Sequence, residues 1–307
     1  MAPVIVFGPT GNIGSVAART AEKHGAKVYL AMRDTKKTIP GLTPEHEEAG
    51  NFTRVEADLT KPETIAAAIK ESGAKRAFVY LARTPDGMKA TLSAMKSSGI
   101  DFIVFLSSFN IALAGPELND IQPSELIPYM HAQVELSLLE VLGTEGFVAV
   151  RPGGFATNTL RWKSGILAGE VQMYSPSFPA DCITPNDMGE VSGTILVSGP
   201  KQDQHIVYLY GPQMLTQGDA TKVAGRVLGK DVTLTSQNAE EALEQMVQTF
   251  GSAPLAEYLM RAYKAAEGRS GQLPHYDEGV ENVALYTGRP ATKFEDWVEA
   301  NKEVFTA

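Results

Sequence analysis

Three glycines near the amino terminus have the spacing of a phosphate-binding turn. Gly8, Gly11 and Gly14 follow the apolar run of residues 4–7 and precede a helical pattern. A strand, a tight glycine turn and a helix N-terminus let the backbone approach a pyrophosphate closely, because no Cβ intervenes and the free N–H groups of the helix point at the phosphates. We therefore predict that this turn binds a dinucleotide.

A basic residue follows the second predicted strand, residues 27–32. In folds selective for NAD an Asp or Glu at this position bonds the ribose hydroxyls, whereas a basic residue can meet the 2′-phosphate of NADP. Arg33 stands here, and Lys36 and Lys37 follow it. We therefore predict NADP(H) as the cofactor. Asp34, next to Arg33, complicates this argument, and an exposed Arg on a turn is the alternative.

Other strand ends are expected to border the same crevice, because the carboxyl ends of parallel strands meet at one edge of a sheet. Asp58 follows the third strand, where the adenine would lie; capping of the next helix is the alternative. Ser107 and Ser108 follow the fifth strand, where hydroxyls face a ligand; capping of backbone groups is again the alternative. The fourth strand ends in residues expected over the middle of the cofactor: Leu81, Ala82 and Arg83.

These residues must be positioned by a regular scaffold. Strand and helix alternate six times between residues 4 and 150, which predicts the α/β class with a Rossmann-type doubly wound parallel sheet. We assign residues 1–152 to an NADP-binding domain, which residues 184–210 rejoin through a strand at 206–210. A smaller, mainly helical substrate-side lobe would comprise residues 153–183 and 211–307, with helices near 217–229, 238–250 and 254–268. The loop 110–127 is long enough to be a lid.

Composition excludes several classes of function. The net charge is −9, and no basic run reaches the length of a nucleic-acid or anionic-membrane patch, so we expect neither partner. A single cysteine, Cys182, excludes an internal disulfide and fits a reducing compartment. The first strand begins by residue 3 and no apolar stretch is long enough to span a bilayer, so we expect a cytoplasmic protein without a signal peptide. We predict no metal site.

Several ordered motifs resemble the NmrA-like family of atypical short-chain dehydrogenase/reductases, near the isoflavone-reductase-like proteins. They are the turn Gly-Pro-Thr-Gly-Asn-Ile-Gly at 8–14, Arg33, His-Ala-Gln-Val-Glu at 131–135, Arg-Pro-Gly-Gly-Phe at 151–155 with Asn158, Pro-Asn-Asp-Met-Gly at 185–189, and Thr-Gly-Arg-Pro at 287–290 followed by Phe-Glu-Asp-Trp at 294–297. The resemblance covers most of the chain and is weakest between about 211 and 280. It implies NADP(H) binding by Gly8, Thr10, Gly11, Asn12, Ile13, Gly14, Arg33 and Lys37, with Asp58 and Leu59 near the adenine and Pro152, Gly153 and Phe155 beside the cofactor.

The catalytic pair of the superfamily is missing. Its reductases commonly use Tyr-x-x-x-Lys, in which the tyrosine protonates the substrate and the lysine lowers its pKa. Alignment on Glu135 places Ile127 in the tyrosine position and His131 in the lysine position. We take His131 as the candidate that contacts the cofactor or relays a proton; a histidine satisfied within its own helix is the alternative. Tyr129 is the weaker candidate, because it projects about 200° away from His131 around the helix.

Three functions follow from these observations. The first is an NADPH-dependent reductase of a small carbonyl or conjugated, aromatic substrate, with His131 helped by Ser107 or Ser108 and a pocket walled by Phe109, Phe155, Trp162 and Tyr174. The second is an NADP(H) sensor that has no chemistry and acts through a protein partner. The third is a non-redox isomerase or cyclase on the same fold. The oligomeric state is not readable from the sequence.

Overall fold

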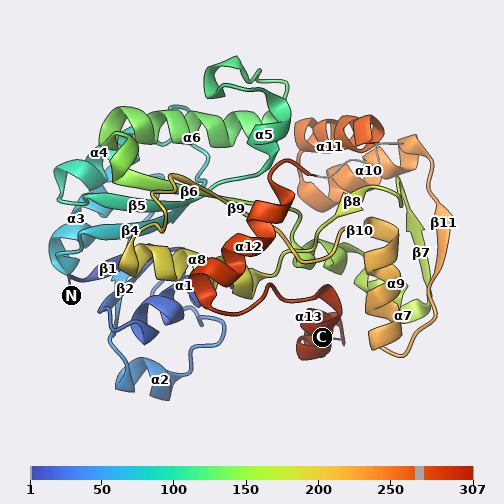
Figure 1. Cartoon of the computed structure of the whole chain (residues 1–307), viewed down its shortest axis with the longest axis horizontal. Coiled ribbons are helices and arrows are strands. Elements are labelled where there is room, and N and C mark those ends of the chain that lie inside the picture. Colours follow the sequence, from blue (N-terminus) through green and yellow to red (C-terminus); the bar gives the residue numbers. More distant parts are fainter. Residues whose placement is uncertain (1, 267–272, 307) are drawn as a thin grey trace.

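The computed structural model describes residues 2–266 and 273–306, and its centre is a seven-stranded parallel sheet (Figure 1). The strand order is β3-β2-β1-β4-β5-β6-β9. The strands are β1 (Val4–Phe7), β2 (Val28–Met32), β3 (Phe52–Glu56), β4 (Arg76–Tyr80), β5 (Phe102–Leu106), β6 (Phe147–Pro152) and β9 (Ile206–Leu209). The order reverses direction at β1, and ligands of open α/β sheets bind at such a point. The predicted Rossmann-type doubly wound sheet is thereby confirmed.

Helices cover both faces of this sheet, and for this reason its strands are almost continuously apolar. One face carries α1 (Asn12–Lys23), α8 (Pro185–Ser198) and α12 (Tyr276–Thr287). The other face carries α3 (Pro62–Ser72), α4 (Lys89–Ser97) and α6 (Leu126–Leu142). Each layer has its own buried apolar cluster, so the sheet is packed on both sides.

Two glycines bring α8 unusually close to α1. A Cβ on Gly189 would lie 2.4 Å from the Cβ of Val16, and a Cβ on Gly193 would lie 2.6 Å from the carbonyl oxygen of Ala17. Only glycine fits at such distances. The close crossing places the first turn of α8, including Pro185, beside the glycine turn that precedes α1.

The smaller part of the chain packs around a separate apolar cluster that contains Trp297 and Phe305. Its helices are η3 (Ala156–Trp162), α7 (Lys163–Ala168), α9 (Gln217–Val227), α10 (Ala239–Phe250), α11 (Ala253–Ala266), α13 (Phe294–Ala300) and α14 (Lys302–Thr306). Its strands form two short pairs, β7 (Glu170–Met173) with β11 (Thr233–Ser236), and β8 (Pro179–Ala180) with β10 (Leu215–Thr216). The helix predicted near residues 254–268 corresponds to α11, and its last two predicted residues, 267 and 268, lie outside the described residues.

Several local elements differ from the sequence-based expectation. The helix α12, inside the expected lobe range 211–307, instead packs on β9 and α8, because its Val283 and Tyr286 belong to the core of the main sheet. The expected lid loop contains α5 (Asn110–Ala114) and η1 (Leu118–Asp120), and the polar connection after β2 contains α2 (Pro44–Ala49). A further 3-10 turn, η2 (Thr144–Gly146), precedes β6.

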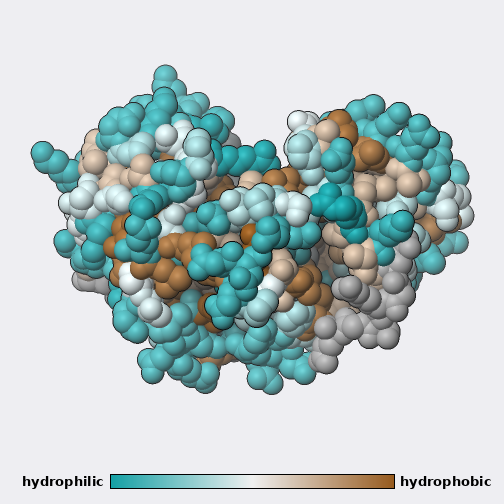
Figure 2. All heavy atoms as spheres, turned by 90° about the horizontal axis from the view of Figure 1, so that it is seen from above, coloured by the Kyte–Doolittle hydropathy of each residue, from teal (hydrophilic) through white to brown (hydrophobic). Residues whose placement is uncertain are grey.

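One face of the molecule shows the mainly polar surface that the composition predicts (Figure 2). In the view of Figure 2 the outer face is mainly hydrophilic, and the surface is hollowed between the larger and the smaller part of the molecule. Within the described ranges, no helix combines the length and apolar character needed to cross a bilayer.

Candidate cofactor site

The glycine turn has the geometry that a bound pyrophosphate requires. Gly8 adopts φ +72°, and its carbonyl oxygen accepts a hydrogen bond from the N–H of Gly11 at 3.1 Å. A Cβ on Gly14 would lie 2.3 Å from that same oxygen, so the turn closes only with glycine at this position. Gly11, the N-cap of α1, offers no side-chain cap, which leaves the first N–H groups of the helix available for phosphate oxygens. These features fit a dinucleotide.

A cleft of about 390 Å³ opens directly over this turn. Its lining combines the turn with the carboxyl ends of β4 and β5 and with residues that follow β6. The lining residues are Gly8, Thr10, Gly11, Asn12, Ile13, Gly14, Phe78, Tyr80, Leu106, Phe155, Thr157 and Pro185. None of these lining residues carries a charge. The cleft is therefore a backbone cradle for phosphate at one end and an apolar chamber at the other.

The ring of Tyr80 is the most prominent side chain of this chamber. Tyr80 ends β4, is 40% exposed, and its Cε1 atom would lie 2.6 Å from a Cβ on Gly8. The ring therefore rests on the glycine turn itself, and it would contact a cofactor placed there. Sequence reasoning missed Tyr80, because a tyrosine at the end of an apolar strand looks like a core residue.

The loop after β2 carries the cations that were predicted to meet a 2′-phosphate. Arg33 and Lys37 are both exposed there. Asp58 lies close to Arg33 at the carboxyl end of β3, and its Oδ1 accepts hydrogen bonds from the backbone N–H and the hydroxyl of Thr60, at 2.9 and 2.8 Å. The hydrogen bond from the Thr60 backbone, together with the charge of Arg33, holds the pKa of Asp58 below its ordinary value.

Ser107 belongs to a buried polar network. Its hydroxyl donates to Oε1 of Glu135 at 2.5 Å, and Arg151 binds the same carboxylate through Nε at 3.0 Å and Nη2 at 2.5 Å. The remaining Nη1 of Arg151 donates to the hydroxyl of Tyr208 at 3.0 Å. The network joins α6 to β5, β6 and β9. The hydroxyl of Ser107 is directed at this carboxylate and not at the cleft.

His131 is a neutral side chain with one nitrogen already engaged. Its Nδ1 lies 2.8 Å from the carbonyl oxygen of Ile127, one turn earlier in α6, so Nδ1 carries the proton and Nε2 keeps its lone pair. Burial lowers the pKa of His131, against the opposing effects of the Ile127 carbonyl and the charge of Glu135. Its ring packs near that of Phe105, at 6.2 Å between centroids. It does not belong to the cleft lining.

The buried carboxylate of Asp181 supports the turn that follows β6. Its carboxylate accepts hydrogen bonds from the N–H groups of Gly154 at 2.6 Å and Gly211 at 3.0 Å. A Cβ on Gly153 would lie 2.4 Å from Oδ1 of Asp181, so this glycine is required for the close approach. Burial raises the pKa of Asp181 to about 6, although both backbone donors lower it. The arrangement holds the strand-like bridge between Phe155 and Ile183 and thus fixes Phe155 in the cleft wall.

Comparison with known proteins places this site in a family. A family model described as NAD(P)H-binding matches residues 8–173. The nitrogen metabolite regulation-like protein bik4 of Gibberella fujikuroi is 35% identical, over 96% of this chain and 95% of that protein. The chain belongs to the NAD(P)H-binding, NmrA-like family.

Solved structures share the fold at low sequence identity. The triphenylmethane reductase of Citrobacter sp. has a TM-score of 0.72 at 14% identity, covering 99% of this chain and 100% of that one. The NADPH-dependent quinone oxidoreductase of Escherichia coli, solved with NADPH, has a TM-score of 0.73 at 16% identity, covering 97% and 99%. Both cover the whole fold, including the smaller part.

Within this NAD(P)H-binding fold the predicted cofactor residues fall into two groups. The cleft lining contains all six predicted residues of the glycine turn and Phe155. The others lie around it: Leu59, Leu81 and Ala82 pack into the core under α3 and α4, Arg83 is exposed, and Pro152 and Gly153 are buried in the chain that supports Phe155. Phe78, Leu106, Thr157 and Pro185, which line the cleft, were not predicted. Their contribution comes from the way the strands and α8 meet, which no local pattern reveals.

The residues predicted to do chemistry do not converge. Oγ of Ser108 accepts hydrogen bonds from the backbone N–H and the side-chain Nδ2 of Asn110, at 3.3 and 3.1 Å, at the start of α5. Tyr129 packs against Ile111 and Ile121, since α6 begins at Leu126 and turns this ring away from His131. Ser108 thus caps a backbone N–H, which was the alternative expectation for both serines, whereas Ser107 donates to the side chain of Glu135.

The predicted aromatic wall is divided as well. Phe155 lines the cleft, whereas Phe109 packs edge-on against Tyr210 at 5.9 Å between centroids. Trp162 packs into the core of the smaller part, and Tyr174 lies 6.5 Å from the ring of Tyr263 on α11. The four side chains therefore do not form one continuous wall, because η3 and β7 carry two of them into the smaller part.

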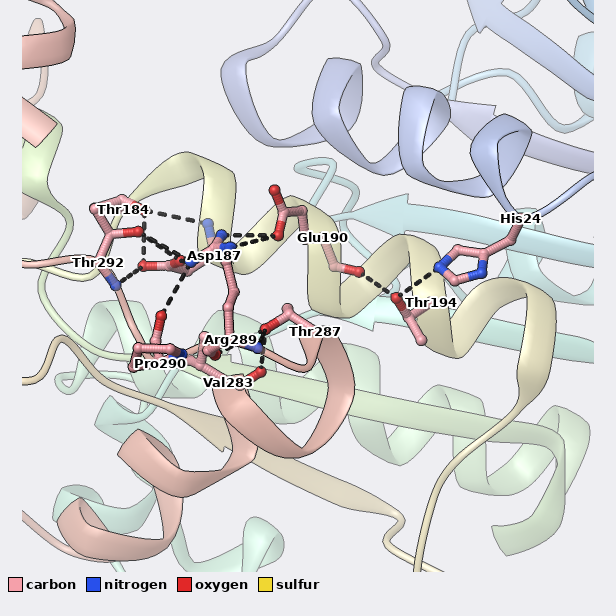
Figure 3. Close-up of polar contacts among 10 residues, drawn as sticks. All are labelled: His24, Thr184, Asp187, Glu190, Thr194, Val283, Thr287, Arg289, Pro290 and Thr292. Carbon is pink, nitrogen blue, oxygen red and sulfur yellow. Dashed lines mark hydrogen bonds and ion pairs between the residues drawn. The ribbon is translucent and has the colours of Figure 1, made fainter.

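Two of the family-like motifs meet at the first turn of α8 (Figure 3). Asp187, fully buried, accepts hydrogen bonds from the hydroxyl of Thr184, the N–H and hydroxyl of Thr292, and pairs with Arg289 at 2.8 Å. Arg289 also pairs with Glu190 at 2.7 Å. The segment after α12 is thus fastened to the helix whose first residue, Pro185, lines the cleft.

Proposed function

We propose that this protein is an NADPH-dependent reductase that transfers hydride to a small apolar acceptor with a delocalised π system, such as a quinone or an enone. The observation that carries the proposal is the composition of the cleft. It runs from the glycine turn to a chamber walled by Phe78, Tyr80, Leu106 and Phe155, without a charged residue in its lining. A flat conjugated molecule matches such a wall through apolar and aromatic contact.

The lining contains no carboxylic acid, histidine or lysine, and its one phenol, Tyr80, rests on the glycine turn; this favours a delocalised acceptor over a simple ketone. Hydride addition to a ketone produces a basic alkoxide that needs a proton at once, and enzymes supply it from a positioned acid. Addition to a quinone gives a hydroquinone anion, whose charge is delocalised and which takes its proton from water. The names of two structural neighbours, a quinone oxidoreductase and a triphenylmethane dye reductase, agree with this acceptor class.

The preference for NADPH rests on Arg33 and Lys37. Neither belongs to an ion pair within the described part of the chain, and both stand on the loop that the ribose 2′-position would approach. His131 stands outside the residues that line the cleft, and its free Nε2 would accept a hydrogen bond from a ribose hydroxyl of the bound cofactor. A neutral imidazole that already donates through Nδ1 is suited to accepting and poorly suited to protonating a substrate.

Turnover with a graded panel of acceptors tests this proposal. We expect NADPH oxidation with quinones and enones to exceed oxidation with unconjugated aldehydes, and we expect a primary isotope effect with NADPH deuterated at C4. His131→Ala should raise the KM for NADPH and leave kcat nearly unchanged. Gly14→Ala, which blocks the turn, is the inactive control. Tight NADPH binding without turnover on any acceptor would overturn the proposal.

A second candidate function is an NADP(H)-responsive regulator without chemistry. The observation that favours it is the commitment of Ser107 to Glu135, which removes a candidate catalytic hydroxyl, together with the regulatory name of the 35% identical relative. A regulator must distinguish NADPH from NADP⁺ in a part of the molecule that a protein partner can reach. Hydrogen exchange of both complexes measures this directly: a difference in protection outside the cleft, combined with no turnover, supports the regulator.

A further inference from the structure

Arg54 braces the loop that carries Arg33. It lies in the middle of β3, paired in register with Leu30 of β2, and its guanidinium reaches over the end of β2. Nη1 donates to the carbonyl oxygen of Thr35 at 2.5 Å and to that of Lys37 at 2.8 Å. One side chain thus fastens two carbonyl groups on the same short loop.

The charge of Arg54 is compensated by a separate partner. Nε and Nη2 donate to Oε1 and Oε2 of Glu47, at 2.5 and 2.7 Å, in a bidentate pair. This contact lowers the pKa of Glu47, which stays ionised. Glu47 is itself held by α2, where Thr43 caps the N–H of His46 at 3.2 Å. Because the pair is neutral as a whole, Arg54 acts on the loop through hydrogen bonds and adds little to its positive charge.

The loop is fixed from within as well. Oδ1 of Asp34 accepts a hydrogen bond from the N–H of Lys36 at 3.0 Å, and the N–H of Lys37 donates to the carbonyl oxygen of Asp34 at 3.3 Å. The acidic side chain that complicates a 2′-phosphate site is thus bonded to its own turn. The side chains of Arg33 and Lys37 remain exposed, while the backbone of their loop is held by Arg54 and by the turn at Asp34.

We infer that Arg54 is a positioning residue for the adenosine 2′-phosphate, which it serves by holding the loop so that Arg33 and Lys37 meet the phosphate together. An unbraced loop would have to be ordered when the phosphate binds, and the lost conformational entropy would weaken binding. This inference rests on the NADP(H) preference proposed above. It adds a residue from another strand, whose side chain need not touch the cofactor.

Two fragments of the cofactor isolate this effect. Adenosine 2′,5′-bisphosphate carries the 2′-phosphate and 5′-AMP lacks it, so calorimetry with both on each variant separates phosphate recognition from adenine binding. We expect Arg54→Met to weaken the bisphosphate about tenfold, the equivalent of one or two hydrogen bonds, and to leave 5′-AMP within about twofold. Arg54→Lys, which keeps the positive charge and the N–H donors of a single nitrogen, should recover part of the loss.

A double variant tests whether Arg54 acts through Arg33. If it does, Arg54→Met should weaken bisphosphate binding clearly less in an Arg33→Ala background than in the wild type, because the brace then positions Lys37 alone. Additive losses would mean that Arg54 acts independently, and would overturn the inference.

Arg76→Met is the matched control. Arg76 also ties backbone carbonyls, those of Leu196 and Val197 at 3.3 and 3.0 Å, but at the far end of α8. Its loss should lower stability without changing the ratio of the two affinities. Two results would overturn the inference about Arg54 and leave the NADP(H) proposal standing. In the first, Arg54→Met and Arg76→Met change the ratio of bisphosphate affinity to 5′-AMP affinity equally. In the second, the wild type prefers the bisphosphate and Arg54→Met does not change this ratio. If the wild type does not prefer the bisphosphate over 5′-AMP, both the NADP(H) proposal and the inference about Arg54 are overturned.

Discussion

Glu135 and Arg151 form an ion pair whose side chains are only 3% and 6% exposed, with Oε2 and Nη2 2.5 Å apart. The pair joins α6 to β6; the Glu135 carboxylate also accepts from Ser107, and each of the three guanidinium nitrogens of Arg151 donates a hydrogen bond. Such a pair is costly to bury and still more costly to break on one side, because the remaining charge then stands alone in the core. The strand ends that carry the cleft are fastened to α6 by this contact.

Removing one partner of this pair should therefore destabilise the protein strongly. We expect Glu135→Gln to lower the free energy of unfolding by about 3 kcal/mol, because Arg151 stays charged and buried. Urea denaturation measures the change. The double variant Glu135→Leu with Arg151→Met should lose less than the single variant. A loss in Glu135→Gln below about 1 kcal/mol, which is typical of exposed pairs, would contradict this assignment.

Gly14 should be intolerant of the smallest side chain. Gly14→Ala places a Cβ 2.3 Å from the Gly8 carbonyl oxygen, and the turn must open to admit it. We expect NADPH affinity to fall at least about tenfold, since the N–H groups of α1 move away from the phosphates. Gly115→Ala is the control, because the nearest atoms to its Cβ would be 3.9 Å away. Equal NADPH affinity of the two variants would show that the turn is not the cradle.

The raised pKa of Asp181 should make the folded protein less stable as the pH rises from 4 to 7.5. Its folded pKa of about 6 exceeds the ordinary value of 3.8. The folded state therefore binds the proton more tightly than the unfolded chain does, and this contribution is full below about pH 4 and lost as the pH rises through 6. Relative to Asp181→Asn, the wild type should lose about 2.5 kcal/mol between pH 4 and pH 7.5. Urea midpoints of both proteins across this range give the difference, and a constant difference would refute the raised pKa.

Arg289 should show a clear asymmetry between its two carboxylate partners. Asp187 is fully buried, whereas the Glu190 side chain is 34% exposed. We expect Asp187→Asn to cost about 3 kcal/mol, because the amide keeps only one of the two buried oxygens that accept from Thr184, Thr292 and Arg289. Glu190→Gln should cost less than about 1 kcal/mol, as exposed pairs do. Thermal denaturation of the two variants measures the stability that each has lost. Equal losses would show that the buried Asp187 contact stabilises the fold no more than the exposed Glu190 contact.

The local features of the site could be predicted from the sequence. The turn from Gly8 to Gly14 is encoded within seven residues, and steric exclusion of Cβ atoms makes its conformation nearly independent of the rest of the fold. The strands of the parallel sheet are equally local, since residues buried on both faces are apolar throughout. These two features were enough to predict the fold and the dinucleotide.

The remainder depends on contacts between distant segments. Whether Ser107 faces the cleft or Glu135 is decided by Arg151, which comes 44 positions later in the chain. Arg54 braces the loop after β2 only because β3 pairs with β2 in one register, and Pro185 reaches the cleft only because Gly189 lets α8 approach α1. The cofactor cradle could be predicted because its geometry is local. Which polar side chains remain free to do chemistry depends on burial and pairing, and these depend on every element that packs around them.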